Sequence, residues 1–188
     1  MTGAQKKAAA KRTRAKAAVS PQDAIRLLTA DHRQVESWFE QFESSRSDDR
    51  KQKLAQEICE ALKVHTTLEE EIFYPAFLEA TGEKDIHHEA EVEHNGAKKL
   101  IAEIEASNPG DDYYDAKVTV LSEMIKHHVN EEEKRGGMFS RARGSDMDLR
   151  QLGEQLAARK EQLSSGAATR RRFQGAAFGT RHGIRPRL

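Results

Sequence analysis

The 188-residue chain is poor in cysteine, proline and aromatic residues, with one cysteine, four prolines and one tryptophan. Its single cysteine, Cys59, excludes an internal disulfide and gives no sign of secretion, and we interpret it as a small core residue. No apolar run approaches the length of a membrane span. The basic N-terminus lacks the apolar stretch of a secretory signal. We therefore expect a cytoplasmic protein with no membrane partner.

Signals for strands and for the common cofactor folds are also missing. Period-two alternation is rare, and there are few β-branched or aromatic clusters. A Gly-rich phosphate loop, a CxxC pair, a GxSxG motif and a dinucleotide fingerprint are all absent from the sequence. With 37% hydrophobic and 33% charged residues, the chain fits an all-α bundle with wide solvated faces and one core.

The net charge of zero hides an uneven distribution. Residues 1–19 carry six Lys/Arg and no acid, and residues 165–188 carry six Arg and no acid, which leaves residues 20–164 with a net charge of −12. This pattern is typical of an acidic domain with two basic tails, and we expect the first tail to be disordered. The tails either contact nucleic-acid phosphates without sequence preference or only offset the acidic domain.

Between the tails, helical periodicity and stop signals predict four long helices and a shorter fifth one. The long helices cover about 21–43, 48–80, 84–106 and 111–135, and the additional amphipathic helix lies within 143–164. Ser20 and Pro21 fit an N-cap and a first helical position, and Pro75 is expected to bend the second helix. Short connections favour an up-down antiparallel four-helix bundle over residues 20–142, with the fifth helix packed outside it.

The most informative motifs are two pairs in which a glutamate follows a histidine by four residues. On a helix this spacing places both side chains on one face. A further histidine lies 33 or 34 residues ahead of each pair, so the arrangement occurs twice. The six residues are His32, His65, Glu69, His94, His128 and Glu132.

All six residues interrupt apolar helical stripes, so we expect them to be buried. A buried carboxylate without a partner is costly, and a metal would resolve this because imidazoles supply nitrogen ligands and carboxylates can bridge two ions. Ligation by nitrogen and oxygen without thiolate suits iron, manganese or zinc. The alternatives are structural core histidines without metal and a ferritin-like site, although the latter places glutamate three residues before histidine.

Other histidines and glutamates near these motifs have less defined roles. His127 is a candidate for contacting a ligand residue, and His127 and Tyr74 are the candidate proton donors. Glu70 is an alternative terminal ligand. The remaining expectations are a solvated position for Glu70, Glu71, Glu131 and Glu133, a surface position for His87 and His88, and a tail position for His182.

Together these motifs resemble the hemerythrin-like, or HHE cation-binding, domain family. The matching segments are Asp31-His32, His65-x-x-x-Glu69-Glu70 running into Ile72-Phe73-Tyr74-Pro75, Glu91-Val92-Glu93-His94, and His127-His128-Val129-x-x-Glu132-Glu133 running into Met138-Phe139. The resemblance covers about residues 21–142. It implies an up-down four-helix bundle with two non-haem iron ions, four histidines as terminal ligands, and Glu69 and Glu132 as bridging carboxylates.

One departure from the oxygen-carrying hemerythrins bears on function. Ala90 stands one turn before His94, where those proteins are richer in histidine, so one iron is expected to have an open position. The resemblance implies a protein that binds or senses oxygen or a related small ligand, or that handles iron. The alternatives are a di-iron enzyme acting on peroxide, nitric oxide or oxygen, and a nucleic-acid-associated protein that binds through its tails. Catalytic residues and the oligomeric state stay open.

Overall fold

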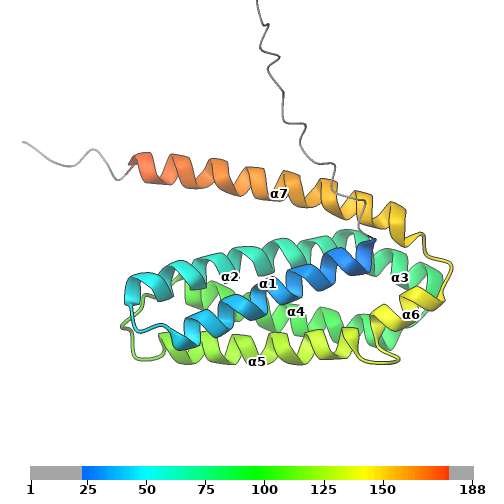
Figure 1. The fold of residues 1–188 in the computed structure, drawn as a ribbon, viewed down its shortest axis with the longest axis horizontal. Coiled ribbons are helices and arrows are strands. Elements are labelled where there is room, and N and C mark those ends of the chain that lie inside the picture. The colour runs from blue at the N-terminus through cyan, green and yellow to red at the C-terminus, as the bar shows by residue number, and fades with distance from the viewer. Residues whose placement is uncertain (1–22, 178–188) are drawn as a thin grey trace, which may run out of the picture.

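The computed structural model describes residues 23–177, with side chains described up to residue 165, and this part of the chain is helical with no strand. Four long helices lie side by side (Figure 1). They are α1 (Ala24–Ser44), α2 (Asp48–Leu68), α4 (Lys84–Glu105) and α5 (Tyr114–Glu133). The pairs in contact are α1 with α2, α2 with α4, α4 with α5, and α5 with α1, so the four helices form a closed ring.

The all-helical prediction is confirmed, but the first helix begins later than expected. It begins at Ala24, and the side chain of Asp23 caps it by accepting a hydrogen bond from the Arg26 backbone N–H at 2.9 Å. An aspartate is among the strongest N-caps because its oxygen satisfies one of the free N–H groups of the first turn. Ser20 and Pro21, the expected cap and first residue, lie outside the described residues, as do the rest of the first tail and residues 178–188.

The predicted second helix of residues 48–80 is continuous but changes its hydrogen-bonding pattern ahead of Pro75. After α2, the five residues of η1 (Glu69–Phe73) form a π-helix, and α3 (Tyr74–Thr81) completes the helix. The Tyr74 N–H bonds the carbonyl of Glu69 five residues back. Proline carries no N–H and cannot continue the regular ladder, and single π-turns inside helices are frequent at functional sites.

The π-turn changes which side chains face inward. A regular helical stripe through His65 and Glu69 predicts Ile72 as the next buried position. Instead Ile72 is only partly buried, whereas Phe73 and Tyr74 are fully buried. A π-turn pairs residues five apart instead of four, and Tyr74 thereby reaches the same side of the helix as Glu69.

Two elements follow α5, and only one of them was anticipated. The seven-residue helix α6 (Met138–Gly144) was not predicted as a separate element. The fifth helix, α7 (Leu149–Ala177), has 29 residues and continues past residue 164, where the sequence predicted it to end. It packs against α1 and α2 through a face that includes the fully buried Leu156. Among the described residues no helix is both long and apolar enough to cross a membrane.

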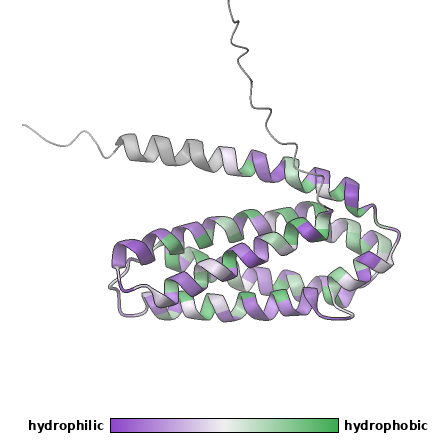
Figure 2. Ribbon diagram, viewed as in Figure 1, coloured by the Kyte–Doolittle hydropathy of each residue, from purple (hydrophilic) through white to green (hydrophobic). Residues whose placement is uncertain are grey.

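The apolar core consists of two clusters. One gathers residues from α1, α2, α4 and α5 towards one end of the bundle, and the other joins the start of α1 to η1, α3, α6 and α7. Hydrophobic and hydrophilic residues alternate along the four long helices of the bundle (Figure 2), as expected of helices that bury one face. Cys59 belongs to the first cluster and is 1% exposed, which confirms its assignment to the core. Burial raises the pKa of its thiol to about 12.

The turn between α5 and α6 fits closely against the end of α5. Gly136 has a φ of 80°, a conformation that favours glycine. At Gly137 a Cβ atom would overlap the carbonyl oxygen of Glu131 and lie 2.9 Å from that of Glu132. The turn therefore requires glycine at two successive positions, one for its backbone angle and one for its lack of a side chain.

We expect Gly137→Ala to destabilise the protein by about 1–3 kcal/mol, the usual cost of overpacking, because backbone atoms rather than a flexible side chain must move. The matched control is Gly144→Ala, where a Cβ would meet nothing within 4 Å and the change should stay within about 0.5 kcal/mol. Urea unfolding of both variants measures the difference. Equal unfolding midpoints for the two would contradict the packing described for this turn.

Candidate metal centre

The structure brings all six predicted residues together in one buried polar layer between the two apolar clusters. Each is at most 5% exposed. Four helices supply the histidines, Glu69 is the first residue of the π-turn, and Glu132 lies one turn after the α5 histidine. The residues are His32, His65, Glu69, His94, His128 and Glu132. Their convergence follows from the helical spacing within each motif and from the ring packing of the four helices.

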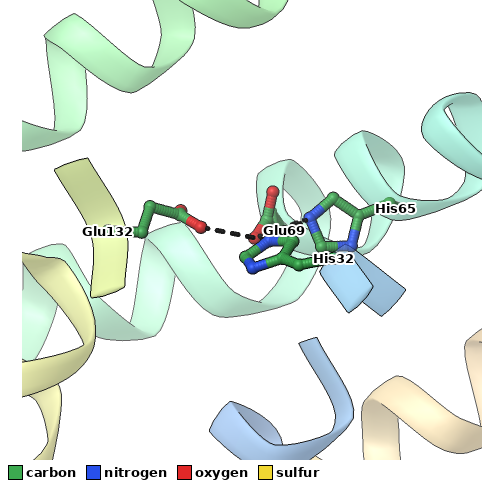
Figure 3. Close-up of side chains that lie close together, drawn as sticks. All are labelled: His32, His65, Glu69 and Glu132. Atoms are coloured by element: carbon green, nitrogen blue, oxygen red, sulfur yellow. Dashed lines mark hydrogen bonds and ion pairs between the residues drawn. The ribbon is translucent and has the colours of Figure 1, made fainter. Parts of the chain in front are cut away.

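One half of the layer is built by α1, α2 and the two glutamates, as Figure 3 shows. The Nε2 atoms of His32 and His65 lie 3.0 Å apart. His65 Nε2 is 3.2 Å from Oε1 of Glu69, and His32 Nε2 is 3.5 Å from Oε2 of Glu132. These four side chains offer ligand atoms close enough together to hold one metal ion.

The other half is built by α4 and α5, and here the ligand atoms close enough together to hold an ion come from Glu69, His94 and His128. The Nε2 atoms of His94 and His128 lie 3.1 Å apart. His94 Nε2 is 3.3 Å from Oε2 of Glu69, and His128 Nε2 is 3.7 Å from Oε1 of Glu132. Each glutamate therefore directs one oxygen to each half, which is the arrangement that lets a carboxylate bridge two ions.

Each of the four imidazoles has a carboxylate near its Nδ1 atom, on the side of the ring away from the centre. The Nδ1 contacts are His32 with Glu133 at 2.7 Å, His65 with Asp31 at 3.8 Å, His94 with Glu70 at 3.0 Å, and His128 with Glu93 at 2.7 Å. A carboxylate accepts a hydrogen bond from a ring N–H, so we assign the ring proton of His32, His94 and His128 to Nδ1. Nδ1 of His65 is too far from Asp31 for a hydrogen bond, but the negative charge on that side favours the same assignment. The Nε2 lone pair then points into the centre, as a metal ligand requires.

The outer carboxylates are themselves paired with side chains nearer the surface. Asp31 pairs with Lys160 of α7, Glu133 with Arg33, Glu70 with Lys98 at 2.6 Å, and Glu93 with His127 at 3.2 Å. The negative charges of the outer ring are thus largely compensated from outside. The charges of Glu69 and Glu132 are not, because the described residues place no Lys or Arg against either of them.

Several buried atoms of the layer lack a hydrogen-bond partner, namely Oε1 of Glu69, Oε2 of Glu132 and Nδ1 of His65. With their protons on Nδ1, paired Nε2 atoms 3.0–3.1 Å apart would also face each other lone pair to lone pair. A cation between them removes this repulsion and gives the free oxygens of Glu69 and Glu132 a partner. Nδ1 of His65 faces Asp31 on the outer side and is not affected by such a cation. The residues therefore fit a metal with nitrogen and oxygen ligands, such as iron, manganese or zinc.

The acid–base properties of the cluster show the same need for positive charge. Burial, together with the negative charge of Glu69, raises the pKa of Glu132 to about 8. Burial alone would raise the pKa of Glu69, but His65 and His94 hold it well below its ordinary value. Burial would likewise lower the pKa of His65, yet attraction to Glu69 and hydrogen bonding raise it to about 10. Protons thus take the place of a cation when none is bound.

Tyr74 adds a hydroxyl group to the centre. Its Oη donates to Oε1 of Glu132 at 3.2 Å and lies 3.2 Å from Nε2 of His94 and 3.5 Å from Oε2 of Glu69. Burial and the charges of Glu69 and Glu132 raise its pKa well above the ordinary value. The sequence suggested Tyr74 only as a candidate proton donor, because its inward position depends on the π-turn.

Two predictions about the glutamates next to the ligand residues were wrong. Glu70 and Glu133 were expected to be solvated, but they contact the outer nitrogens of His94 and His32. Glu70, the alternative terminal ligand, approaches Nδ1 rather than the centre. Glu71 is exposed as expected and pairs with Arg159. Glu131 is partly buried and pairs with Lys134, away from the ligand histidines.

The remaining histidines occupy the periphery. The side chain of His127 is 62% exposed. It contacts Glu93, which in turn contacts His128. His88 is exposed as predicted, whereas His87 is partly buried with its ring 5.8 Å from that of Tyr74. His182 lies outside the described residues.

A helical bundle with a buried layer of histidines and shared carboxylates defines a cation-binding protein. Over residues 23–139 the sequence matches the family described as the hemerythrin HHE cation-binding domain, and the chain belongs to this family. The resemblance inferred from the motifs is thereby confirmed. No match was found among curated proteins.

A solved structure supports the fold. The chain resembles the crystal structure of a hemerythrin HHE cation-binding domain-containing protein from Mycobacterium kansasii, with a TM-score of 0.68 and 22% sequence identity. The similarity covers 82% of this chain and 94% of that chain. At this identity the likeness concerns the fold.

The outer carboxylates lead to a test with a matched control. We expect Glu93→Gln to lower metal affinity about 10–100-fold, the usual effect of removing a partner that orients a ligand, while the protein stays folded. Glu123→Gln removes an exposed carboxylate from α5 at a distance from the layer and should leave the affinity unchanged. Competition with a chelator of known affinity measures both. Equal affinities would show that Glu93 does not orient His128.

Proposed function

We infer that the chain binds two iron ions in an up-down four-helix bundle and uses them to bind or sense oxygen or a related small ligand, or to handle iron. The observation that carries this proposal is the sharing of Glu69 and Glu132 between the two histidine pairs. A single-ion site has no need for carboxylates that face both ways. His32 and His65 would hold one ion, and His94 and His128 the other.

The protein's own contribution would be to hold the ligands in place. The outer carboxylates fix the orientation of the imidazoles, and the two apolar clusters pack against the layer from either side. When bound, iron supplies affinity for oxygen, peroxide or nitric oxide and the capacity for electron transfer. Ala90 lies one turn before His94 and is 5% exposed, so no side chain from that position competes for a ligand place.

An enzyme acting on peroxide, nitric oxide or oxygen is the second candidate, and Tyr74 is the observation that favours it. A buried hydroxyl that lies beside both shared carboxylates is placed to donate a hydrogen bond to a bound molecule. Sustained turnover by the iron-loaded protein, rather than stoichiometric binding, distinguishes this candidate from the first.

Association with nucleic acid through the basic tails stays a prediction, because residues 1–22 and the side chains beyond 165 lie outside the described part of the chain. The cytoplasmic location also stays a prediction. A band-shift comparison of the full chain with one lacking residues 1–19 and 165–188 tests the role of the tails.

The test of metal binding is the elemental content of protein reconstituted with ferrous iron without oxygen. We expect about two irons per chain, the count of a carboxylate-bridged bundle, and the loss of most of this iron together with a lower melting temperature in Glu69→Ala. The control is Glu71→Ala, two residues away and exposed, which should retain its iron. Full iron content in Glu69→Ala would contradict the bridging role.

A further inference from the structure

A cleft of about 240 Å³ opens beside the metal centre, lined by residues of α4, α5 and the turn that leads into α6. His128 and Glu132, which are 4% and 2% exposed, line it together with Ala90. On the side of the first apolar cluster, the four histidines instead line a void of about 10 Å³. Such a void is no larger than one water molecule, so the cleft offers the wider approach to the centre.

Acidic side chains outnumber basic ones along the cleft. Four carboxylates line it, namely Glu89, Glu93, Glu131 and Glu132, against two cations, Lys134 and Arg141. Both cations are engaged, because Lys134 pairs with Glu131 and Arg141 pairs with Glu83 outside the cleft. With all four carboxylates ionised the lining carries a formal charge of −2, and without the buried Glu132 it carries −1. An acidic cleft attracts cations and repels anions.

The inner end of the cleft provides ligand groups. Oε2 of Glu132 is buried without a hydrogen-bond partner. Nε2 of His128 lies 3.7 Å from Oε1, the other oxygen of the same carboxylate. Ala90, with its small side chain, lines the same cleft. Glu89 is exposed on the outer part of the lining, where its charge meets an approaching ion first.

We propose that this cleft is the path by which a divalent metal ion, ferrous iron in the native protein, reaches the buried centre. The proposal rests on the metal-binding function inferred above. Glu89 draws the hydrated ion to the mouth of the cleft, and Glu132 with His128 replaces its water at the inner end. A neutral molecule such as hydrogen peroxide gains nothing from the acidic lining, so the charge pattern specifies a cation.

The test is the rate of Co²⁺ uptake by the full-length, metal-free protein, followed by the visible absorption of bound cobalt. In Glu89→Lys the rate should fall roughly threefold or more at low ionic strength, the direction expected when steering charges are reversed. It should return to the wild-type rate near about 1 M salt, where charges are screened over about 3 Å. Final cobalt content should not change.

The matched control is Glu123→Lys, which makes the same change of charge on the exposed part of α5 away from the cleft and should take up Co²⁺ at the wild-type rate. Equal rates in the two variants overturn the proposal. Failure of the wild-type protein to bind cobalt or iron at all overturns the proposed function as well, so the two failures are distinguishable.

A second variant tests the shape of the path rather than its charge. Ala90→Leu should slow both Co²⁺ uptake and its removal by a chelator at every salt concentration, because the added side chain narrows the inner end. If instead Ala90→Leu is folded and loads at the wild-type rate, the metal reaches the centre by another route. Should this variant fail to fold, the pair of lysine variants decides the question.

Discussion

The structure depends on the burial of two carboxylates, Glu69 and Glu132, among four imidazoles at the middle of the bundle. Burying an ionised carboxylate costs several kcal/mol unless opposite charge accompanies it. The described part of the chain places no Lys or Arg against either group. The Lys and Arg side chains nearby form ion pairs with the outer carboxylates instead. A bound cation is therefore the element that completes this core. The two apolar clusters, the ring of four helices and the outer ion pairs all surround this site.

The layer has an internal two-fold pattern that ties the bundle together. An acidic residue precedes His32 and His94, and these two acids, Asp31 and Glu93, contact the next histidine of the same half. The acid that follows each shared glutamate contacts a histidine of the opposite half, as Glu133 does with His32. One set of contacts therefore joins helices within a half, and the other set joins the halves. The same residues that orient the ligands also fix the packing of the helices.

The helices of the bundle and the six residues of the buried layer could be predicted from the sequence. Helical periodicity and the spacing of His65 with Glu69 are local patterns that extend over only one or two turns. The inward position of Tyr74 could not, since it depends on a π-turn that breaks that periodicity. The contacts of Glu70 and Glu133 were missed because a charged residue beside a stripe looks solvated until its partner on another helix is known. The full length of α7 was missed because its later turns have little apolar pattern.

The account rests most directly on the presence of two metal ions that share Glu69 and Glu132. Crystals of the iron-loaded protein, measured above and below the iron absorption edge, would locate the metal without assumptions about ligands. We expect two anomalous peaks, one beside His32 and His65 and one beside His94 and His128, with both carboxylates between them. A single peak, or peaks that lie away from the buried layer, would contradict the account.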